Sequence, residues 1–166
     1  APWTLLVYML NRRSPKEASI ENFLLDKSKV DKLLVLIIEY IKIHVEEQVK
    51  SGATIIQIFD SWAGLVKDKD VEKYIYEPTK KLVQFTQSLD IPAICFPREI
   101  EDYPKYVKIV NPDVISIDYD VDPVKIVKEI KIPIQGGINP KILLTDKEIL
   151  KKEVEKYLHV FKDHPY

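Results

Sequence analysis

One stretch of the sequence, residues 52–64, constrains the fold more than any other. Residues 54–59 read TIIQIF, a run of β-branched and aromatic side chains that holds one polar residue, Gln57. This composition is typical of a strand that is covered on both faces, as in a parallel sheet. The run then breaks into a polar turn with Asp60, Ser61 and Gly64. Because α/β folds bind ligands at the carboxyl ends of parallel strands, this turn is the first candidate for a functional site.

Three more short strands are expected along the chain, separated by segments with helical patterns. The expected strands are residues 91–96, 113–118 and 132–135, and the helical patterns cover residues 17–51, 71–89, 103–110, 122–130 and 146–161. Residues 1–10 are apolar, and Pro2 favours a helix start or a turn there. Strict alternation of strands and helices predicts parallel βαβ units with right-handed crossovers.

Two architectures fit this alternation, an open doubly wound sheet and a (β/α)8 barrel. No Gly-x-Gly-x-x-Gly follows any expected strand, so the dinucleotide fingerprint is missing from the sequence. A full barrel needs about 250 residues. We therefore predict an α/β fold of the (β/α)8 TIM-barrel family, here about half a barrel with four parallel strands, as a single partial domain over residues 1–166. We expect this segment to belong to a longer or processed protein, because it begins with Ala1.

Charge and cysteine content narrow the class of protein. The formal charge is −1, from 25 basic and 26 acidic residues, which gives no general attraction to nucleic acid. No apolar run reaches the roughly 18 residues that a membrane span needs. The N-terminal residues lack the basic region of a signal peptide, and the one cysteine, Cys95, fits a reducing compartment. We expect a cytoplasmic protein with neither nucleic acid nor membrane as a partner.

Each expected strand ends in a short turn that carries polar or glycine residues. If the strands are parallel, these turns lie on one face of the sheet. That face would hold Asp60, Ser61, Arg98, Asp118, Gln135 and Asn139. Any one of these residues alone is readily explained as a solvated loop residue or a helix cap. Together they predict a polar site, but the pattern names no reaction.

Two common chemistries are poorly supported by the residues. Ser61 lies in DSWAG and not in the Gly-x-Ser-x-Gly of a nucleophile elbow. His44 and His159 lie in helical segments, where we expect them far from the strand ends. Zinc would require closely spaced Cys and His ligands. Cys95 lies inside an expected strand, where a small buried apolar side chain is the default interpretation, so no metal site is predicted.

Four motifs carry a resemblance to a known family. Residues 1–9 read APWTLLVYM, residues 57–64 QIFDSWAG, residues 116–119 SIDY and residues 135–140 QGGINP. They resemble the Ala-Pro-Trp/Phe-Thr-Leu…Tyr-Met, Phe-Asp/Glu-Ser-x-Ala-Gly, Gly-Leu-Asp-Trp and Gln-Gly-Asn-Leu-Asp-Pro segments of uroporphyrinogen decarboxylase, an enzyme of haem biosynthesis. The order and approximate spacing of the motifs agree along the whole chain.

The resemblance implies a fold, a reaction and partners. The family fold is a (β/α)8 barrel, usually a homodimer whose clefts face each other. The reaction is a lyase reaction that removes the carboxyl groups from the four acetate side chains of uroporphyrinogen III and gives coproporphyrinogen III. It uses no metal and no organic cofactor. Loss of CO2 from an acetate on a pyrrole needs an electron sink, which protonation of the ring by a nearby acid supplies.

The resemblance also implies roles for individual residues. Tyr8 and Ser61 match substrate-contacting positions of the family. Ser61 would donate a hydrogen bond to a substrate carboxylate. Tyr8 would do the same or would orient the reacting acetate. Phe59 would line the pocket beside the macrocycle, and Asp60 would turn away from it or support the loop. The catalytic residues stay unassigned, because the family's central aspartate, its substrate-binding arginines and its C-terminal histidine match no position in residues 1–166.

The sequence also departs from the family at some positions, and other functions stay open. Arg12 and Arg13 stand where many members have a glycine-rich loop, and Gly137 and Asn139 replace an asparagine and an aspartate. One alternative is a superfamily methyltransferase that acts on corrinoid or thiol carriers, against which the isolated Cys95 argues. Another is a non-catalytic half-barrel with a binding or structural role. We expect this chain alone to form no coproporphyrinogen.

Overall fold

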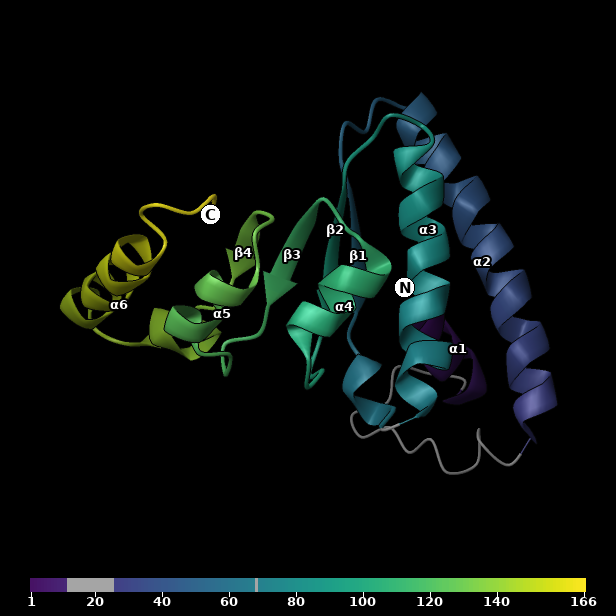
Figure 1. The fold of residues 1–166 in the computed structure, drawn as a ribbon, viewed down its shortest axis with the longest axis horizontal. Helices are drawn as coiled ribbons and strands as arrows, with labels where there is room; N and C mark the ends of the chain where they lie inside the picture. The colour runs from purple at the N-terminus through teal and green to yellow at the C-terminus, as the bar shows by residue number, and fades with distance from the viewer. Residues whose placement is uncertain (12–25, 68) are drawn as a thin grey trace.

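The computed structural model describes residues 1–11, 26–67 and 69–166 (Figure 1). Its elements, in chain order, are α1 (Pro2–Asn11), α2 (Lys27–Lys50), β1 (Ile56–Asp60), η2 (Ala63–Leu65), η3 (Glu72–Tyr76), α3 (Glu77–Gln87), β2 (Ala93–Pro97), α4 (Tyr103–Val110), β3 (Val114–Ile117), α5 (Pro123–Glu129), β4 (Ile134–Gly136), η4 (Pro140–Leu144) and α6 (Lys147–Val160). Arg12, Arg13 and the start of the helix expected from residue 17 lie outside the described residues.

The strands form one parallel sheet in the order β1-β2-β3-β4, so each strand pairs with the next one along the chain (Figure 1). A doubly wound sheet reverses its strand order part-way, whereas a barrel adds each strand beside the last. The simple order therefore confirms the prediction of an α/β half-barrel with four parallel strands.

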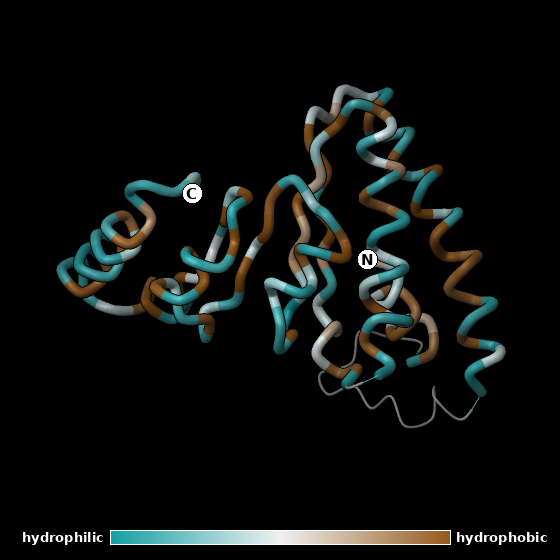
Figure 2. The backbone as a smooth tube through the Cα atoms, viewed as in Figure 1, coloured by the Kyte–Doolittle hydropathy of each residue, from teal (hydrophilic) through white to brown (hydrophobic). Residues whose placement is uncertain are grey.

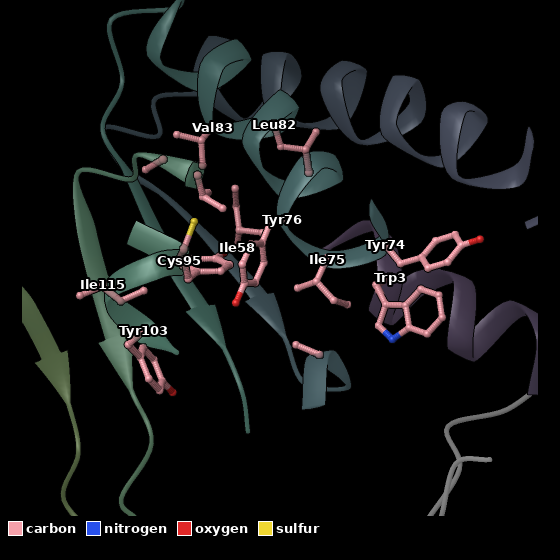
Figure 3. Packing of buried hydrophobic residues seen from close by; sticks show 14 of the residues in the cluster. Trp3, Ile58, Tyr74, Ile75, Tyr76, Leu82, Val83, Cys95, Tyr103 and Ile115 are labelled. Atoms are coloured by element: carbon pink, nitrogen blue, oxygen red, sulfur yellow. The ribbon is translucent and has the colours of Figure 1, made fainter. Parts of the chain in front are cut away.

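The apolar core lies between the sheet and the helices. The strand register aligns Ile58 with Cys95, Cys95 with Ile115, and Ile115 with Ile134, and all four side chains are buried. Figure 3 shows the first three on the side of the sheet where Val83 of α3 lies. Figure 2 shows the apolar residues of the sheet and the helices: apolar segments fill β3 and recur turn by turn along α2. Burial of one continuous apolar row thus fixes which face of the sheet the helices cover.

Aspartate and proline residues set the starts of the helices. Asp102 precedes α4 and accepts a hydrogen bond from the Lys105 N–H at 2.8 Å, and Asp122 caps α5 in the same way at 2.9 Å from Val124 N. Both helices carry proline in the first turn, where its missing N–H costs no helical hydrogen bond. The long segment before β2 starts as a wider π-helical turn, η3, and becomes α-helical at Glu77, next to Pro78.

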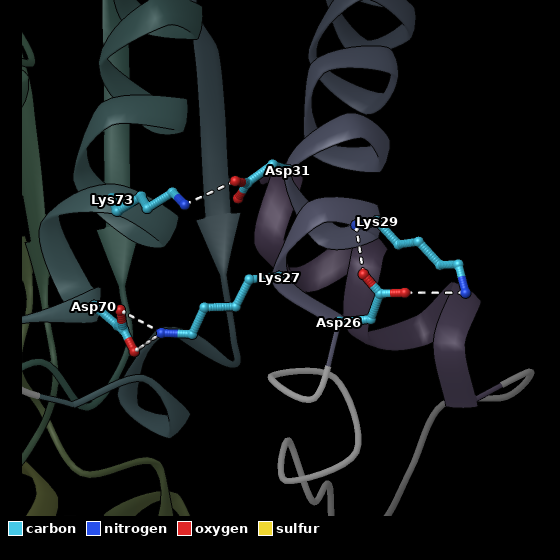
Figure 4. A network of polar contacts seen from close by, with 6 residues as sticks. All are labelled: Asp26, Lys27, Lys29, Asp31, Asp70 and Lys73. Carbon is cyan, nitrogen blue, oxygen red and sulfur yellow. Dashed lines mark hydrogen bonds and ion pairs between the residues drawn. The ribbon is translucent and has the colours of Figure 1, made fainter.

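The N-terminal end of α2 is tied to the segment around η3 by two exposed ion pairs (Figure 4). Lys27 Nζ lies 2.9 Å from Asp70 Oδ2, and Lys73 Nζ lies 2.8 Å from Asp31 Oδ2. Exposed pairs of this kind contribute about 0–1 kcal/mol each. Residues of both α2 and α3 are buried in the apolar core, so these pairs add little to the packing of α2 on α3.

The other face of the sheet is open within the described part of the chain. Phe59 points to this face and is 53% exposed. The expectation that the first strand is covered on both faces was therefore wrong for its inner face. No described helix covers that face, because the helices that follow the strands pack on the opposite side. Among the described residues, no helix combines the length and hydropathy needed to cross a membrane.

Burial of Cys95 generates a test of the core. Burial raises the pKa of its thiol to about 12, because the charged thiolate would lack solvation. We expect Ellman's reagent at pH 8 to leave Cys95 unmodified in the folded protein and to modify it fully in urea. Modification of the folded protein at the rate of the unfolded protein would contradict the position of this side chain between the sheet and the helices.

Candidate functional site

An open cleft of about 410 Å³ lies on the inner face of the sheet, at the carboxyl ends of the strands. All four strands or the turns that follow them contribute to it. The apolar and aromatic lining residues are Phe59, Phe96, Ile117, Tyr119, Ile138 and Pro140, and the polar ones are Gln57, Arg98, Ser116, Asp118 and Gln135. Parallel α/β folds bind ligands at this position, and an apolar wall with a few convergent polar groups is typical of such sites.

Polar side chains form the floor of the cleft. Gln57 Nε2 donates a hydrogen bond to Ser116 Oγ at 3.3 Å, although β2 separates the strands that carry them. Ser116 pairs in register with Gln135 on β4. Inward-facing positions of a barrel are usually filled by branched apolar side chains. The row Gln57–Ser116–Gln135 instead presents amide and hydroxyl groups that can donate or accept hydrogen bonds.

Aromatic rings form one wall of the cleft. The rings of Phe59 and Phe96 meet edge to face, with their centroids 6.1 Å apart and their planes at 86°. Tyr119 is 49% exposed, so its ring also remains accessible. Exposed ring faces and edges of this kind can pack against a flat unsaturated ligand.

Asp60 lies on the opposite face of β1, and it joins α1 to the turn that carries Ser61. The Asp60 carboxylate is buried, and Thr4 Oγ1 donates a hydrogen bond to its Oδ1 at 2.7 Å. The Trp62 N–H donates to Thr4 Oγ1 at 3.3 Å, and Trp3 Nε1 donates to the Trp62 carbonyl at 3.0 Å. Burial raises the pKa of Asp60, and the hydrogen bond from Thr4 opposes this shift. These contacts fix α1 against the end of β1.

A second set of bonds joins the turns after β1, β2 and β3. We call residues Arg98 and Glu99 the Arg98–Glu99 turn. The Arg98 N–H donates to the Asp60 carbonyl at 3.1 Å, and the Arg98 carbonyl accepts from the Gly64 N–H at 3.0 Å. The Glu99 N–H donates to Asp118 Oδ2 at 2.6 Å. Glu99 adopts a left-handed backbone with φ of 61°, which costs a residue with a side chain about 1–2 kcal/mol.

The Asp118 carboxyl is shaped by this arrangement. Burial raises its pKa, while the hydrogen bond from the Glu99 N–H and the charge of Arg98 lower it. Its own N–H donates to the Tyr103 hydroxyl at 3.2 Å. Burial also raises the pKa of Tyr103, so that its hydroxyl stays protonated. Asp118 therefore acts at the rim of the cleft as a hydrogen-bond acceptor that is fixed on two sides.

The residues predicted to bind a substrate fall in different places. Phe59 lines the cleft. Ser61 is partly exposed in the turn after β1, and Tyr8 is half-buried on α1, one helical turn after Thr4. Within the described residues, neither Ser61 nor Tyr8 belongs to the lining of the cleft, although both lie on segments that the Asp60–Thr4 contact joins.

The prediction of a shared polar face was partly wrong. Arg98, Asp118 and Gln135 meet at the cleft. Asp60 points to the other side of β1, as the family resemblance implied and the strand-end pattern did not. Asn139 Oδ1 accepts a hydrogen bond from the Lys141 N–H at 3.0 Å, so it caps η4. Alternation of side chains along a strand explains the position of Asp60, because it lies two residues after the buried Ile58.

Gln57 and Ser116 were not among the predicted site residues. Each lies inside its strand with an apolar residue on either side, Gln57 in β1 and Ser116 in β3. That pattern was a usable signal, since a polar residue within a buried strand needs either a partner or an open face.

The described residues give little support to a metal site. Among residues 1–11, 26–67 and 69–166, no group of three or more His, Cys, Asp or Glu side chains is close enough to hold a metal ion. Cys95 is paired in register with Ile58 on the apolar side of the sheet and faces the Tyr106 hydroxyl. Its protonated thiol is a poor metal ligand, because metals bind the thiolate.

The contact between Gly64 and Glu99 generates a stability prediction. A Cβ atom at Gly64 would lie 2.5 Å from Glu99 Cβ and 2.6 Å from the Glu99 carbonyl oxygen. We expect Gly64→Ala to lower the free energy of unfolding by about 1–3 kcal/mol, as overpacking does. Urea unfolding measures this change, and the exposed Lys152→Ala on α6 is the control. An unchanged midpoint for Gly64→Ala would show that the turns are not packed together.

The Asp60–Thr4 contact generates a second prediction. Thr4→Val leaves a buried carboxylate without its donor, which costs about 1–3 kcal/mol. The raised pKa means that the folded protein holds the Asp60 proton more tightly than the unfolded one, so stability falls as pH rises through this pKa. Thr4→Val removes a hydrogen-bond donor that favours the charged form of Asp60. The loss in free energy of unfolding caused by Thr4→Val should therefore be larger at pH 7 than at pH 4. Urea unfolding at both pH values measures the difference.

Thr86→Val provides the matched control for Thr4→Val. Thr86 is fully buried, but its hydroxyl donates only within α3, to the Leu82 carbonyl at 2.9 Å. We expect its cost to be the same at the two pH values. Equal pH dependence of both variants would contradict the coupling between Thr4 and the Asp60 carboxyl.

Comparison with known proteins accords with this geometry. The family model described as Uroporphyrinogen decarboxylase (URO-D) matches residues 1–166. The uroporphyrinogen decarboxylase of Rickettsia bellii (strain RML369-C) is 35% identical over 170 residues, which cover 98% of this chain and 50% of the relative. That of Rickettsia africae (strain ESF-5) is 34% identical, with 98% of this chain and 49% of the relative covered. The chain thus spans about half the length of these relatives. A match over all 166 residues, on a half-barrel with its cleft at the strand ends, makes this chain a member of the uroporphyrinogen decarboxylase family.

Proposed function

We propose that this chain forms half of the barrel of a uroporphyrinogen decarboxylase and that its cleft contributes to the binding of uroporphyrinogen III. The observation that carries the proposal is the cleft itself, which combines an aromatic wall, a polar floor and an arginine at the strand ends. A substrate made of pyrrole rings with acetate side chains offers flat apolar faces and negative charge. The two sets of lining residues match these two properties.

The reaction assigned to the site is decarboxylation without a metal or an organic cofactor. Protonation of a pyrrole ring creates the electron sink, the bond between the acetate methylene and its carboxylate breaks, and its electron pair enters the ring as CO2 leaves. A proton then adds to the methylene carbon, which becomes a methyl group, and the proton that was added to the ring leaves, which restores the pyrrole. No proton donor is assigned to a residue of this chain, and its cleft residues bind and orient the substrate.

Tyr8 and Ser61 are proposed to hold substrate carboxylates by hydrogen bonds, and Phe59 is proposed to pack beside the macrocycle. The joined position of their segments supports this assignment. Thr4 connects α1 to Asp60 and to the Trp62 N–H, on either side of Ser61. The separation of Tyr8 from Ser61 is therefore set by the fold before a ligand binds, which lowers the entropic cost of binding.

The activity is assigned to a complete barrel and not to this chain alone. Its inner sheet face is open within the described residues, so a bound macrocycle would be covered on one side only. Catalysis of this kind depends on excluding water and surrounding the reacting group. We also propose that the complete protein is a cytoplasmic homodimer, as the family resemblance implies.

A chimera tests the proposed function. Residues 1–166 replace the matching segment of the Rickettsia bellii relative, and the chimera is incubated with uroporphyrinogen III. We expect coproporphyrinogen from the chimera and none from the isolated chain, as measured by chromatography of the oxidised porphyrins. Ser61→Ala and Tyr8→Phe should each lower kcat/KM of the chimera by about tenfold, the effect of one charge-assisted hydrogen bond.

Two substitutions of the same kind provide controls for the chimera. Ser88→Ala removes an exposed hydroxyl at the end of α3, and Tyr40→Phe changes an exposed tyrosine on α2 that lies outside the cleft. Both should keep the full rate. A folded chimera that forms no coproporphyrinogen would refute the proposed function, and equal losses in control and site variants would refute the roles of Ser61 and Tyr8.

A further inference from the structure

Arg98 is the one basic side chain that lines the cleft within residues 1–11, 26–67 and 69–166. We propose that Arg98 is a carboxylate-binding residue of this site, and that a carboxylate of the tetrapyrrole takes the place of Glu99 as its partner. The inference rests on the proposed function for the identity of the ligand. It adds a position that the resemblance does not assign.

The present partner of Arg98 holds it only weakly. Arg98 Nη2 lies 2.7 Å from Glu99 Oε1, and the two side chains are 42% and 54% exposed. Ion pairs between exposed side chains contribute little to stability. A guanidinium carries five N–H donors in a planar fork that can bind a carboxylate through two of them. Replacement of the Glu99 carboxylate by a ligand carboxylate at Arg98 therefore changes the free energy little. Other contacts of the ligand with the cleft can then favour the replacement.

The backbone that carries Arg98 is fixed before a ligand arrives. Its N–H donates to the carbonyl of Asp60, the last residue of β1, and its carbonyl accepts from the N–H of Gly64 in η2. The next residue, Glu99, is held in its left-handed conformation, and its N–H is bound to Asp118 Oδ2. An unfavourable backbone conformation that is held by neighbouring segments is common at ligand sites. Here it sets the point from which the arginine side chain extends.

The surroundings of Arg98 suit a charged group at the edge of a ligand that is built from flat pyrrole rings. Phe59 and Phe96 form the adjoining wall, so a macrocycle packed on them would direct its acidic side chains toward the rim. Asp118, the acidic residue among the described lining residues, already accepts the Glu99 N–H through one oxygen. The carboxylates of Glu99 and Asp118 both oppose a second anion, and Glu99 competes for Arg98 directly.

Direct binding to the 166-residue chain tests the proposal. The probe is uroporphyrin I, a fluorescent tetrapyrrole with acidic side chains, and its fluorescence anisotropy is followed during titration with protein. We expect Arg98→Gln to weaken binding about tenfold, because one charge-assisted contact is lost. The affinity of Arg98→Lys should lie between those of the unchanged protein and Arg98→Gln, because lysine keeps the positive charge but cannot form two parallel hydrogen bonds to a carboxylate. Glu99→Gln should tighten binding severalfold, because it removes the competing carboxylate.

Two controls separate Arg98 from a general effect of charge. Lys105→Gln removes an exposed cation on α4 that is paired with Glu72, outside the cleft, and should leave the affinity unchanged. A porphyrin with four N-methylpyridinium groups should bind Arg98→Gln at least as well as the unchanged protein. Urea unfolding of each variant confirms that it folds, since the backbone bonds of the Arg98–Glu99 turn do not involve the arginine side chain.

The outcomes separate this inference from the proposed function. Equal affinity of Arg98→Gln and the unchanged protein for uroporphyrin I would overturn the role of Arg98, while decarboxylation by the chimera could still hold. Binding by none of the variants, Glu99→Gln included, would also overturn it. In an active chimera, Arg98→Gln should raise KM about tenfold with a smaller change in kcat. A folded chimera that carries no substitution and still forms no coproporphyrinogen would instead refute the proposed function.

Discussion

The parallel ladder between β1 and β2 is the constraint on which both the core and the cleft depend. Its register aligns Ile56 with Ala93, Ile58 with Cys95 and Asp60 with Pro97, and these side chains face the helices. The residues between them, Gln57 and Phe59, face the cleft. A shift of the ladder by one residue would exchange the two faces and bury the polar ones against the helices. The apolar row and the candidate site are thus two consequences of one register.

Much of the fold was predictable because strands and helices have different periods, but the strand ends were not. The first strand was expected over residues 54–59 and is observed over Ile56–Asp60. Residues 54 and 55 have the right composition, yet pairing begins only where the Pro92 carbonyl accepts the Ile56 N–H. The length of the neighbouring strand, which no local pattern contains, decides where the ladder starts and ends.

The candidate site was predictable in position and only partly in residues. Parallel order alone places the strand-end turns on one face, so Arg98, Asp118 and Gln135 meet as expected. The resemblance already implied that Asp60 turns away, and strand alternation gives the physical reason; the same alternation would have brought Gln57 and Ser116 into the site. The left-handed backbone of Glu99 and its close approach to Gly64 depend on contacts between distant turns. Single-sequence patterns carry no such information.

The bonds among the turns after β1, β2 and β3 bear on how this half-barrel can diversify. Asp60, Gly64, Arg98, Glu99 and Asp118 share backbone contacts, so a residue inserted in one turn would displace the other two. The segment after β4 has a separate anchor, the Tyr157 hydroxyl that donates to the Gly137 carbonyl at 2.6 Å. Changes of loop length are therefore least costly from residue 138 to residue 145, and ligand preference has most freedom to drift there while the other three turns stay the same.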